Sequence, residues 1–228
     1  MQVSGPVTRL PSAAGPGSPA AWFPEQAPPS PRRRRKHALA EQVRALIADV
    51  LLLDVETADE AALAETERLL SAARLALAAL PVVRTEGLYL AGEDAHLFER
   101  SPLSGLANAL AAPLTMEFDG ARTLAHATYG PAYEGPPGSV HGGYVISAFD
   151  DLLGVAQAAS GVAGLTGTLT VKLLRRTPLD CRIDYEAGVV EQTGRKVVAW
   201  GRSTHHGELL AEATGIFIEP RSGYLTQG

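Results

Sequence analysis

The N-terminal third of the chain shows apolar residues with helical spacing. Between residues 39 and 51 they recur every three or four positions, at Leu39, Val43, Leu46, Ile47, Val50 and Leu51. In the next stretch leucines fall seven apart, at Leu63, Leu70 and Leu77. Thr57 or Asp59 can cap the second helix and Pro81 ends it. The pattern predicts a helical hairpin over residues 37–82 that packs on the main domain or on a partner subunit.

A different pattern, the alternation of polar and apolar residues, dominates the C-terminal third. Over residues 166–173 threonines occupy one face and aliphatic residues the other, which predicts a strand. Further strands are predicted over residues 181–190, 196–206 and 209–220, and shorter ones over residues 88–92, 114–118 and 121–130. Because the later strands are joined by short turns, such as the one containing Gly194, we expect an antiparallel sheet.

Between these regions lies a strongly apolar helix that contains two adjacent aspartates. At 100° per residue, six apolar side chains share an arc of about 100°: Val145, Ile146, Phe149, Leu152, Leu153 and Ala156. Asp151 is nearly opposite that arc, so we expect it in solvent or against a partner. Asp150 lies on the flank of the arc, at the border between core and surface.

The charge of the chain is unevenly distributed. Residues 1–36 are rich in Pro, Ser and Ala and carry a net charge of +5, and we predict that they form a disordered basic tail. Since the whole chain carries −5, residues 37–228 sum to −10. A folded part this acidic argues against nucleic-acid binding.

Other classes of protein are disfavoured as well. The single cysteine, Cys181, cannot form an internal disulfide, and the apolar runs are too short for a membrane span. A cytoplasmic location is the expectation. No His or Cys spacing of a metal site occurs, so no metal is predicted.

The start of the apolar helix suggests chemistry. Residues 141–143 read His-Gly-Gly, and glycines leave backbone N–H groups unshielded. A helix N-terminus carries partial positive charge, so it can bind an anion or stabilise a developing oxyanion. Asp150 follows Gly142 by eight residues, and a half-buried aspartate suits general base catalysis.

Residues 133–154, YEGPPGSVHGGYVISAFDDLLG, together with the strand region after them, resemble the hotdog-fold acyl-CoA thioesterases. The similarity is to the branch that contains the PaaI-type enzymes and the thioesterase superfamily members, and it covers roughly residues 120–220. It implies an α+β fold in which an antiparallel sheet wraps around a long central helix. The chain then divides into the tail, the hairpin and a hotdog thioesterase domain over residues 83–228.

The resemblance also implies roles for individual residues. Asp150 is the expected catalytic carboxylate, as general base or nucleophile, and the Gly142 N–H is expected to polarise the thioester carbonyl. His141 is expected to orient the loop or a water molecule. Thr166 matches a Ser or Thr that assists water or substrate from the facing subunit. Acyl-CoA is the expected substrate, without cofactor, in a homodimer or dimer of dimers with sites at the subunit interface.

Substrate-binding roles are expected for Gly143, Glu134, Arg175 and Arg176. In the PaaI-type enzymes an Asn or Gln precedes the motif histidine, whereas this chain has Glu134 and Gly135 there. Arg175 and Arg176 suit the phosphates of CoA, although a surface salt bridge at a strand end explains them equally well. In the family this strand usually ends in Tyr-(Lys/Arg)-Arg-Pro, whereas this chain has Leu173, Leu174, Arg175 and Arg176 there, without the aromatic residue and the proline.

Two alternatives to a thioesterase stay open. Hydratases and dehydratases of acyl thioesters share the fold, but the spacing between His-Gly-Gly and Asp150 argues against them. A hotdog domain that binds acyl-CoA or a protein without turnover would use the tail and hairpin for interaction. The carboxylate of Asp150 and the hydroxyl of Thr166 favour catalysis over simple binding.

Overall fold

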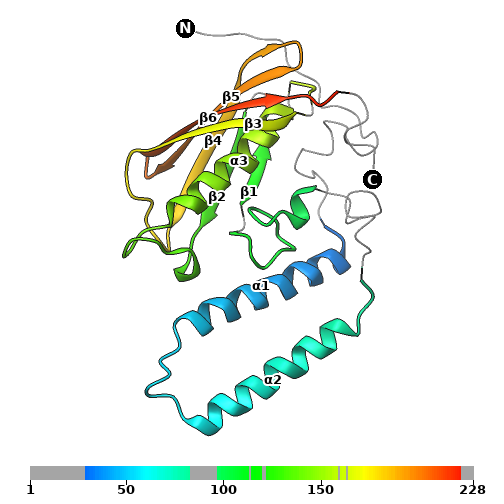
Figure 1. The fold of residues 1–228 in the computed structure, drawn as a ribbon, viewed down its shortest axis with the longest axis vertical. Helices are drawn as coiled ribbons and strands as arrows, with labels where there is room; N and C mark the ends of the chain where they lie inside the picture. Colours follow the sequence, from blue (N-terminus) through cyan, green and yellow to red (C-terminus); the bar gives the residue numbers. More distant parts are fainter. Residues whose placement is uncertain are drawn as a thin grey trace.

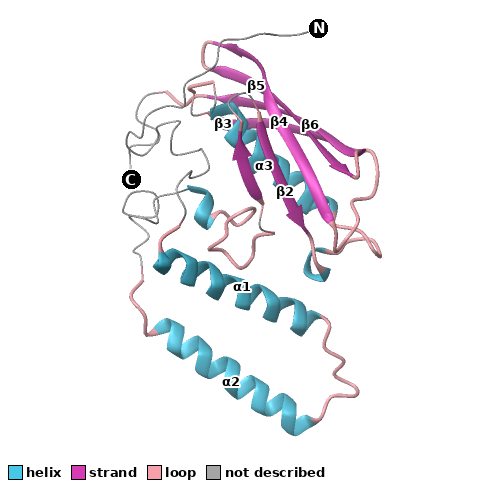
Figure 2. Cartoon of the chain, turned by 180° about the vertical axis from the view of Figure 1, so that it is seen from behind, coloured by secondary structure: helices cyan, strands magenta, loops and turns pink. Residues whose placement is uncertain are grey.

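The structure is a computed structural model that describes residues 29–82 and 97–221, except residues 113, 120, 121, 159 and 163. One antiparallel sheet carries a long helix on one face, and a pair of helices lies at one side of this unit (Figures 1 and 2). The strand predicted over residues 88–92 lies outside the described residues.

The sheet has six strands in the order β1-β2-β4-β5-β6-β3. Their bounds are β1 Thr115–Phe118, β2 Thr123–Thr128, β3 Leu165–Leu173, β4 Arg182–Thr193, β5 Lys196–His205 and β6 Glu208–Ile218. All neighbouring pairs are antiparallel. Strands β4, β5 and β6 form a meander, and β3 adds to its edge by pairing with β6. The sequence patterns therefore predicted these six strands correctly.

Helix α3, Gly142–Ala158, lies across one face of the sheet and provides the centre of the core (Figure 1). Phe149, Leu152 and Leu153 are completely buried. A Cβ at Gly201 of β5 would stand 3.2 Å from both Phe149 and Leu153. The glycine therefore lets the helix approach the sheet closely, as the wrapped helix of a hotdog fold requires.

Two antiparallel helices precede this domain, α1 over Pro31–Leu51 and α2 over Glu60–Ala78. The boundary predicted between tail and hairpin, after residue 36, is wrong, because α1 begins six residues earlier. Ser30 caps α1 by accepting a hydrogen bond from the Arg33 N–H (3.2 Å), and a proline occupies the first position. The basic run had suggested a tail, but it forms the first turns of a helix.

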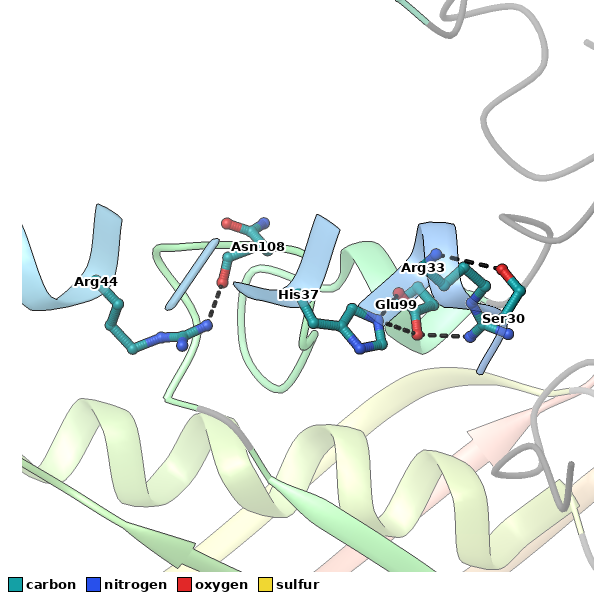
Figure 3. Close-up of polar contacts among 6 residues, drawn as sticks. All are labelled: Ser30, Arg33, His37, Arg44, Glu99 and Asn108. Atoms are coloured by element: carbon teal, nitrogen blue, oxygen red, sulfur yellow. Dashed lines mark hydrogen bonds and ion pairs between the residues drawn. The ribbon is translucent and has the colours of Figure 1, made fainter. Parts of the chain in front are cut away.

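Polar side chains of α1 contact the hotdog domain (Figure 3). Glu99, in the short 3-10 helix η4 (Leu97–Arg100), accepts hydrogen bonds from Arg33 (2.6 Å) and pairs with His37 (2.7 Å). About two turns after His37, Arg44 donates to the Asn108 carbonyl (3.0 Å). The arginine and histidine side of α1, rather than its apolar side, therefore fixes it to the domain.

Candidate active site at the start and middle of α3

The N-terminus of α3 is capped by a histidine. The Nδ1 atom of His141 accepts a hydrogen bond from the Gly143 N–H (3.0 Å). With Nδ1 an acceptor, the neutral ring carries its proton on Nε2. Among the described residues, none accepts a hydrogen bond from the Gly142 N–H. The cap therefore occupies one amide of the first turn and leaves the preceding amide available.

A tight loop before the helix holds His141 in place. The Gly135 N–H donates to the Ser139 carbonyl (2.9 Å), and the His141 N–H donates to the Tyr133 carbonyl (2.8 Å). A Cβ at Gly135 would stand 2.7 Å from the Cα of His141, which no side chain tolerates. Gly138 has φ +71°, in the left-handed region that favours glycine. The glycines of the Gly-Pro-Pro-Gly segment are thus needed for the turn that delivers the histidine.

Asp150 lies two turns further along α3, on the half-buried flank that the apolar arc predicted. The Thr166 Oγ1 donates a hydrogen bond to Asp150 Oδ1 (2.9 Å). The register of β3 shifts between Thr166 and Thr168, a bulge that redirects the side chains at the start of the strand. Thr166 therefore lies on the same chain as the Asp150 that it contacts.

The residues of the predicted site form two separate groups on one chain. Gly142 and Asp150 are eight residues apart on α3, which is about 12 Å along the helix axis at 1.5 Å per residue. Strand β3 runs antiparallel to the helix: Leu173 lies beside Gly142, and Thr166 lies beside Asp150. One thioester carbonyl cannot contact the amide and the carboxylate of the same chain at once.

Asp151 is not the solvent-exposed residue that the helical arc predicted. It accepts hydrogen bonds from Ser101 Oγ (2.6 Å) and from Ser104 Oγ, both in the turn after η4. Burial raises the pKa of Asp151, the two serine hydroxyls oppose this effect, and the charge of Asp150 adds to it. The prediction is wrong because this turn covers the side of α3 that the amphipathic pattern assigned to solvent.

Helix η4 and the turn after it connect the hairpin to α3. Glu99 binds Arg33 and His37 of α1, and Ser101 binds Asp151, beside the candidate catalytic aspartate. Sequence reasoning missed Glu99, Ser101 and their partners. No periodicity connects positions more than 45 residues apart, and serines in a turn are common for purely local reasons.

The three other side chains with predicted substrate roles differ in their contacts. The Glu134 carboxylate accepts a hydrogen bond from the Gly138 N–H (2.6 Å) and so braces the loop. Arg175 pairs with Glu208 (2.6 Å) and donates to the Leu209 carbonyl (2.8 Å), as expected of a salt bridge at a strand end. Arg176 is exposed next to Thr177, whose carbonyl accepts from the Val140 N–H (2.8 Å). It therefore lies near the His-Gly-Gly end of α3.

Two further kinds of feature are absent from the described residues. No group of three or more His, Cys, Asp or Glu side chains is arranged to hold a metal ion there. Nor does this part of the chain contain a helix long and apolar enough to cross a membrane.

Comparison with known proteins supports the thioesterase resemblance. No family model matches the sequence. The acyl-coenzyme A thioesterase THEM4 of Xenopus laevis is 34% identical over 92 residues, which cover 40% of this chain and 41% of that protein. The match therefore spans about two fifths of the length of this curated relative.

A similarity of wider extent is found among solved structures. The crystal structure of a thioesterase superfamily protein matches with a TM-score of 0.70 at 26% identity, over 84% of this chain and 97% of that one. Residues 83–228 make up less than two thirds of this chain, whereas the match covers 84% of it. The match therefore extends into the helical hairpin. The chain has the α+β hotdog fold of the thioesterase superfamily, as the resemblance predicted.

Proposed function

We propose that the protein is an acyl-CoA thioesterase, which hydrolyses an acyl-CoA to the free acid and CoA. The observation that carries this proposal is the arrangement on α3, where an available Gly142 N–H lies at the capped start and Asp150 lies on the flank. The similarity to THEM4 of Xenopus laevis and to a thioesterase superfamily structure supports the same activity.

The chemistry uses these groups in a simple way. The Gly142 N–H, at the positive end of the helix, donates to the thioester oxygen as it becomes negative. As general base, Asp150 takes a proton from water while the water oxygen bonds to the carbonyl carbon, and the carbon–sulfur bond then breaks. The CoA thiolate leaves and is protonated. As nucleophile, Asp150 would instead form an anhydride that water hydrolyses. Both roles remain part of the proposal.

Two chains are needed for this reaction, because one chain keeps the two groups about 12 Å apart. Strand β3 is at the edge of the sheet, and its residues are largely exposed. An edge strand offers unpaired backbone groups to a second copy. If two β3 strands pair antiparallel about a two-fold axis, Asp150 and Thr166 of one chain approach Gly142 of the other. A homodimer, alone or within a dimer of dimers, is therefore the proposed active unit.

Arg176 is the proposed contact for the phosphates of CoA, because it is exposed near the Gly142 end of the site. The ion pair of Arg175 with Glu208 makes it the weaker candidate. The Gly143 N–H donates to His141, so the role proposed for Gly143 is to support the cap of the helix. Glu134 has the same kind of role, in the loop.

Thiol release from short-chain, long-chain and aromatic acyl-CoAs tests the proposal. The wild type should turn over at least one class. Asp150→Asn should bind the same substrate and lose turnover by about 10²–10⁴-fold, the usual contribution of a general base. Asp151→Asn is the matched control, since it makes the same substitution at the next residue, and it should keep turnover.

Two results would contradict the proposal. One is an absence of turnover on every class while acyl-CoA still binds, which would indicate a binding module. The other is equal activity of Asp150→Asn and wild type, which would remove Asp150 from the mechanism.

A further inference from the structure

The helical hairpin exposes far more apolar surface than a soluble helix pair needs. Fifteen large aliphatic side chains between residues 39 and 82 are exposed, and no residue of α2 is buried. Val50, Leu52 and Leu75 are each more than 60% exposed. Continuous apolar patches of this kind mark interaction surfaces.

The two helices do not cover each other. They lie side by side and antiparallel (Figures 1 and 2), yet Leu46 and Ile47 of α1 and Leu77 of α2 all remain about 40% exposed. A groove of about 340 Å³ runs between the helices, lined by Val50, Leu53, Leu63 and Leu70 among others. The hotdog domain does not fill it, because α1 contacts that domain through Arg33, His37 and Arg44.

The two ends of the hairpin carry opposite charge. Residues 45–67, around the loop between the helices, contain seven carboxylates and no Lys or Arg. Residues 31–36 and 68–82, at the other end, contain seven basic residues and no carboxylate. The hairpin is thus acidic at its closed end and basic at its open end.

Helix stability does not explain this distribution. A helix is stabilised by acidic residues in its first turn and basic residues in its last turn. Helix α1 has the reverse, with arginines and no acidic residue in the first turn and no basic residue in the last. Most of these charges are exposed, including Arg32, Arg34 and Arg35.

We infer that the hairpin is a docking surface for the hairpin of a second copy of this chain, packed antiparallel about a two-fold axis. In that arrangement the acidic end of each hairpin lies on the basic end of the other, and the leucines of the four helices share one core. Charge complementarity selects this partner. An anionic lipid surface would attract the basic end but repel the seven carboxylates of the closed end.

Two variants with altered charge test the inference on the full chain. The first, Arg32→Glu/Arg34→Glu/Arg35→Glu, lowers the net charge of the open end from +7 to +1 and keeps Arg33. The second, Asp49→Lys/Glu56→Lys/Glu67→Lys, changes the net charge of the closed end from −7 to −1 and keeps the helix cap Asp59 and the Glu65–Arg68 ion pair. The readout is the molar mass by sedimentation and light scattering over a dilution series, which requires no catalytic activity.

Each variant alone should dissociate at a protein concentration at least about tenfold higher than the wild type does, a loss of one factor of ten in affinity. An equimolar mixture should associate more tightly than either variant alone, because the unaltered acidic end of the first variant then lies on the unaltered basic end of the second. Circular dichroism checks that both variants keep the fold.

Superimposable dilution profiles for the wild type and both variants would overturn the inference, as would a monomeric wild type. Weaker association of both variants without recovery in the mixture would also overturn the inference. The surface would then bind something other than the hairpin of a second copy. Unchanged association of the two variants leaves the thioesterase proposal intact, because the two experiments share neither variants nor readout. A monomeric wild type would also contradict the homodimer proposed as the active unit.

Discussion

Asp150 and Asp151 are neighbours in the sequence whose carboxylates have different surroundings. Asp150 receives one hydrogen bond, from the exposed Thr166, and remains half-buried. Asp151 receives two, from the serines of the turn after η4. The single hydrogen bond leaves Oδ2 of Asp150 available for water or substrate. Both serines instead donate to Oδ2 of Asp151, which fills the hydrogen-bonding capacity of that oxygen. This difference supports the catalytic role proposed for Asp150 rather than for Asp151.

The raised pKa of Asp151 has a consequence for stability. A carboxyl whose folded pKa lies above its ordinary value of 3.8 contributes stability below that value and loses it as the pH rises through the folded pKa. At pH 7 the wild type therefore carries the cost of a buried charge. Asp151→Asn, whose amide oxygen can accept from both serines, should melt at least as high as the wild type at pH 7.

The same variant should lose its advantage at pH 4, because the raised pKa of Asp151 favours the protonated carboxyl there in the wild type. Thermal melting at both pH values checks this. A variant less stable than the wild type by more than about 1 kcal/mol at pH 7 would show that the charge itself is required.

Gly135 is a second residue whose replacement has a definite expected cost. Its Cβ would clash with the Cα of His141 at 2.7 Å, so Gly135→Ala must displace the loop or the histidine. We expect a loss of about 1–3 kcal/mol, typical of overpacking, and lower thioesterase turnover.

The matched control for this substitution is Gly130→Ala. There the new Cβ meets only Asp180 Oδ1 at 3.9 Å, and the backbone is extended at φ −84°. Chemical denaturation of both variants measures the difference. Equal stability of Gly135→Ala and the wild type would contradict the role assigned to the loop.

At the scale of elements, the periodicity of the sequence predicted the strands and helices but not the side-chain contacts between them. The alternating stretches gave six strands and the apolar arc gave α3, because the sheet and the helix each bury one face in a shared core. For α1 the same pattern identified the helix but not its contacts. Its apolar side stays exposed, and Arg33, His37 and Arg44 bind the domain instead. Such polar contacts depend on partners at positions 99 and 108, which no local pattern indicates.

The attachment of α1 should depend on pH. Burial opposes the charge of Glu99, but hydrogen bonds from Arg33 and His37 outweigh burial and hold the pKa of Glu99 below its ordinary value of 4.5. The stabilisation is therefore present above pH 4.5 and is lost as the pH falls through the folded pKa. Amide hydrogen exchange over residues 31–51, corrected for intrinsic rates, should show α1 losing protection in that acidic range.

Glu99→Gln should reproduce this loss at pH 7, at a cost of about 2 kcal/mol for hydrogen bonds to charged groups. Glu41→Gln is the control, because Glu41 forms an exposed ion pair with Arg44 on the same helix and should change protection little. Unchanged protection in Glu99→Gln would mean that α1 is held by other contacts.

For the whole molecule, the main point is that one chain separates the two groups of the proposed site. The amide at the start of α3 and the Asp150–Thr166 pair lie too far apart to act on one carbonyl. The sequence pointed to the candidate residues of the site, because the His-Gly-Gly and the aspartate are local features. It could not show which residues share a chain, since that depends on the direction of β3 relative to α3.

A mixing experiment tests this account most directly. Asp150→Asn removes the carboxylate, and Gly142→Pro removes the amide hydrogen at a position where the first turn of a helix accepts proline. Gly142→Ala is the control that adds a Cβ but keeps the N–H. The new Cβ would meet only the flexible end of Leu173, so this variant should stay active.

Thioesterase turnover is then measured for each inactive variant alone and for the two variants co-expressed. A two-fold dimer has two sites. When the variants pair at random, half of the dimers contain one chain of each variant, and each such dimer has one intact site. Activity should therefore recover to about a quarter of the wild-type value. Co-expressed variants no more active than either parent would contradict a site shared between two chains.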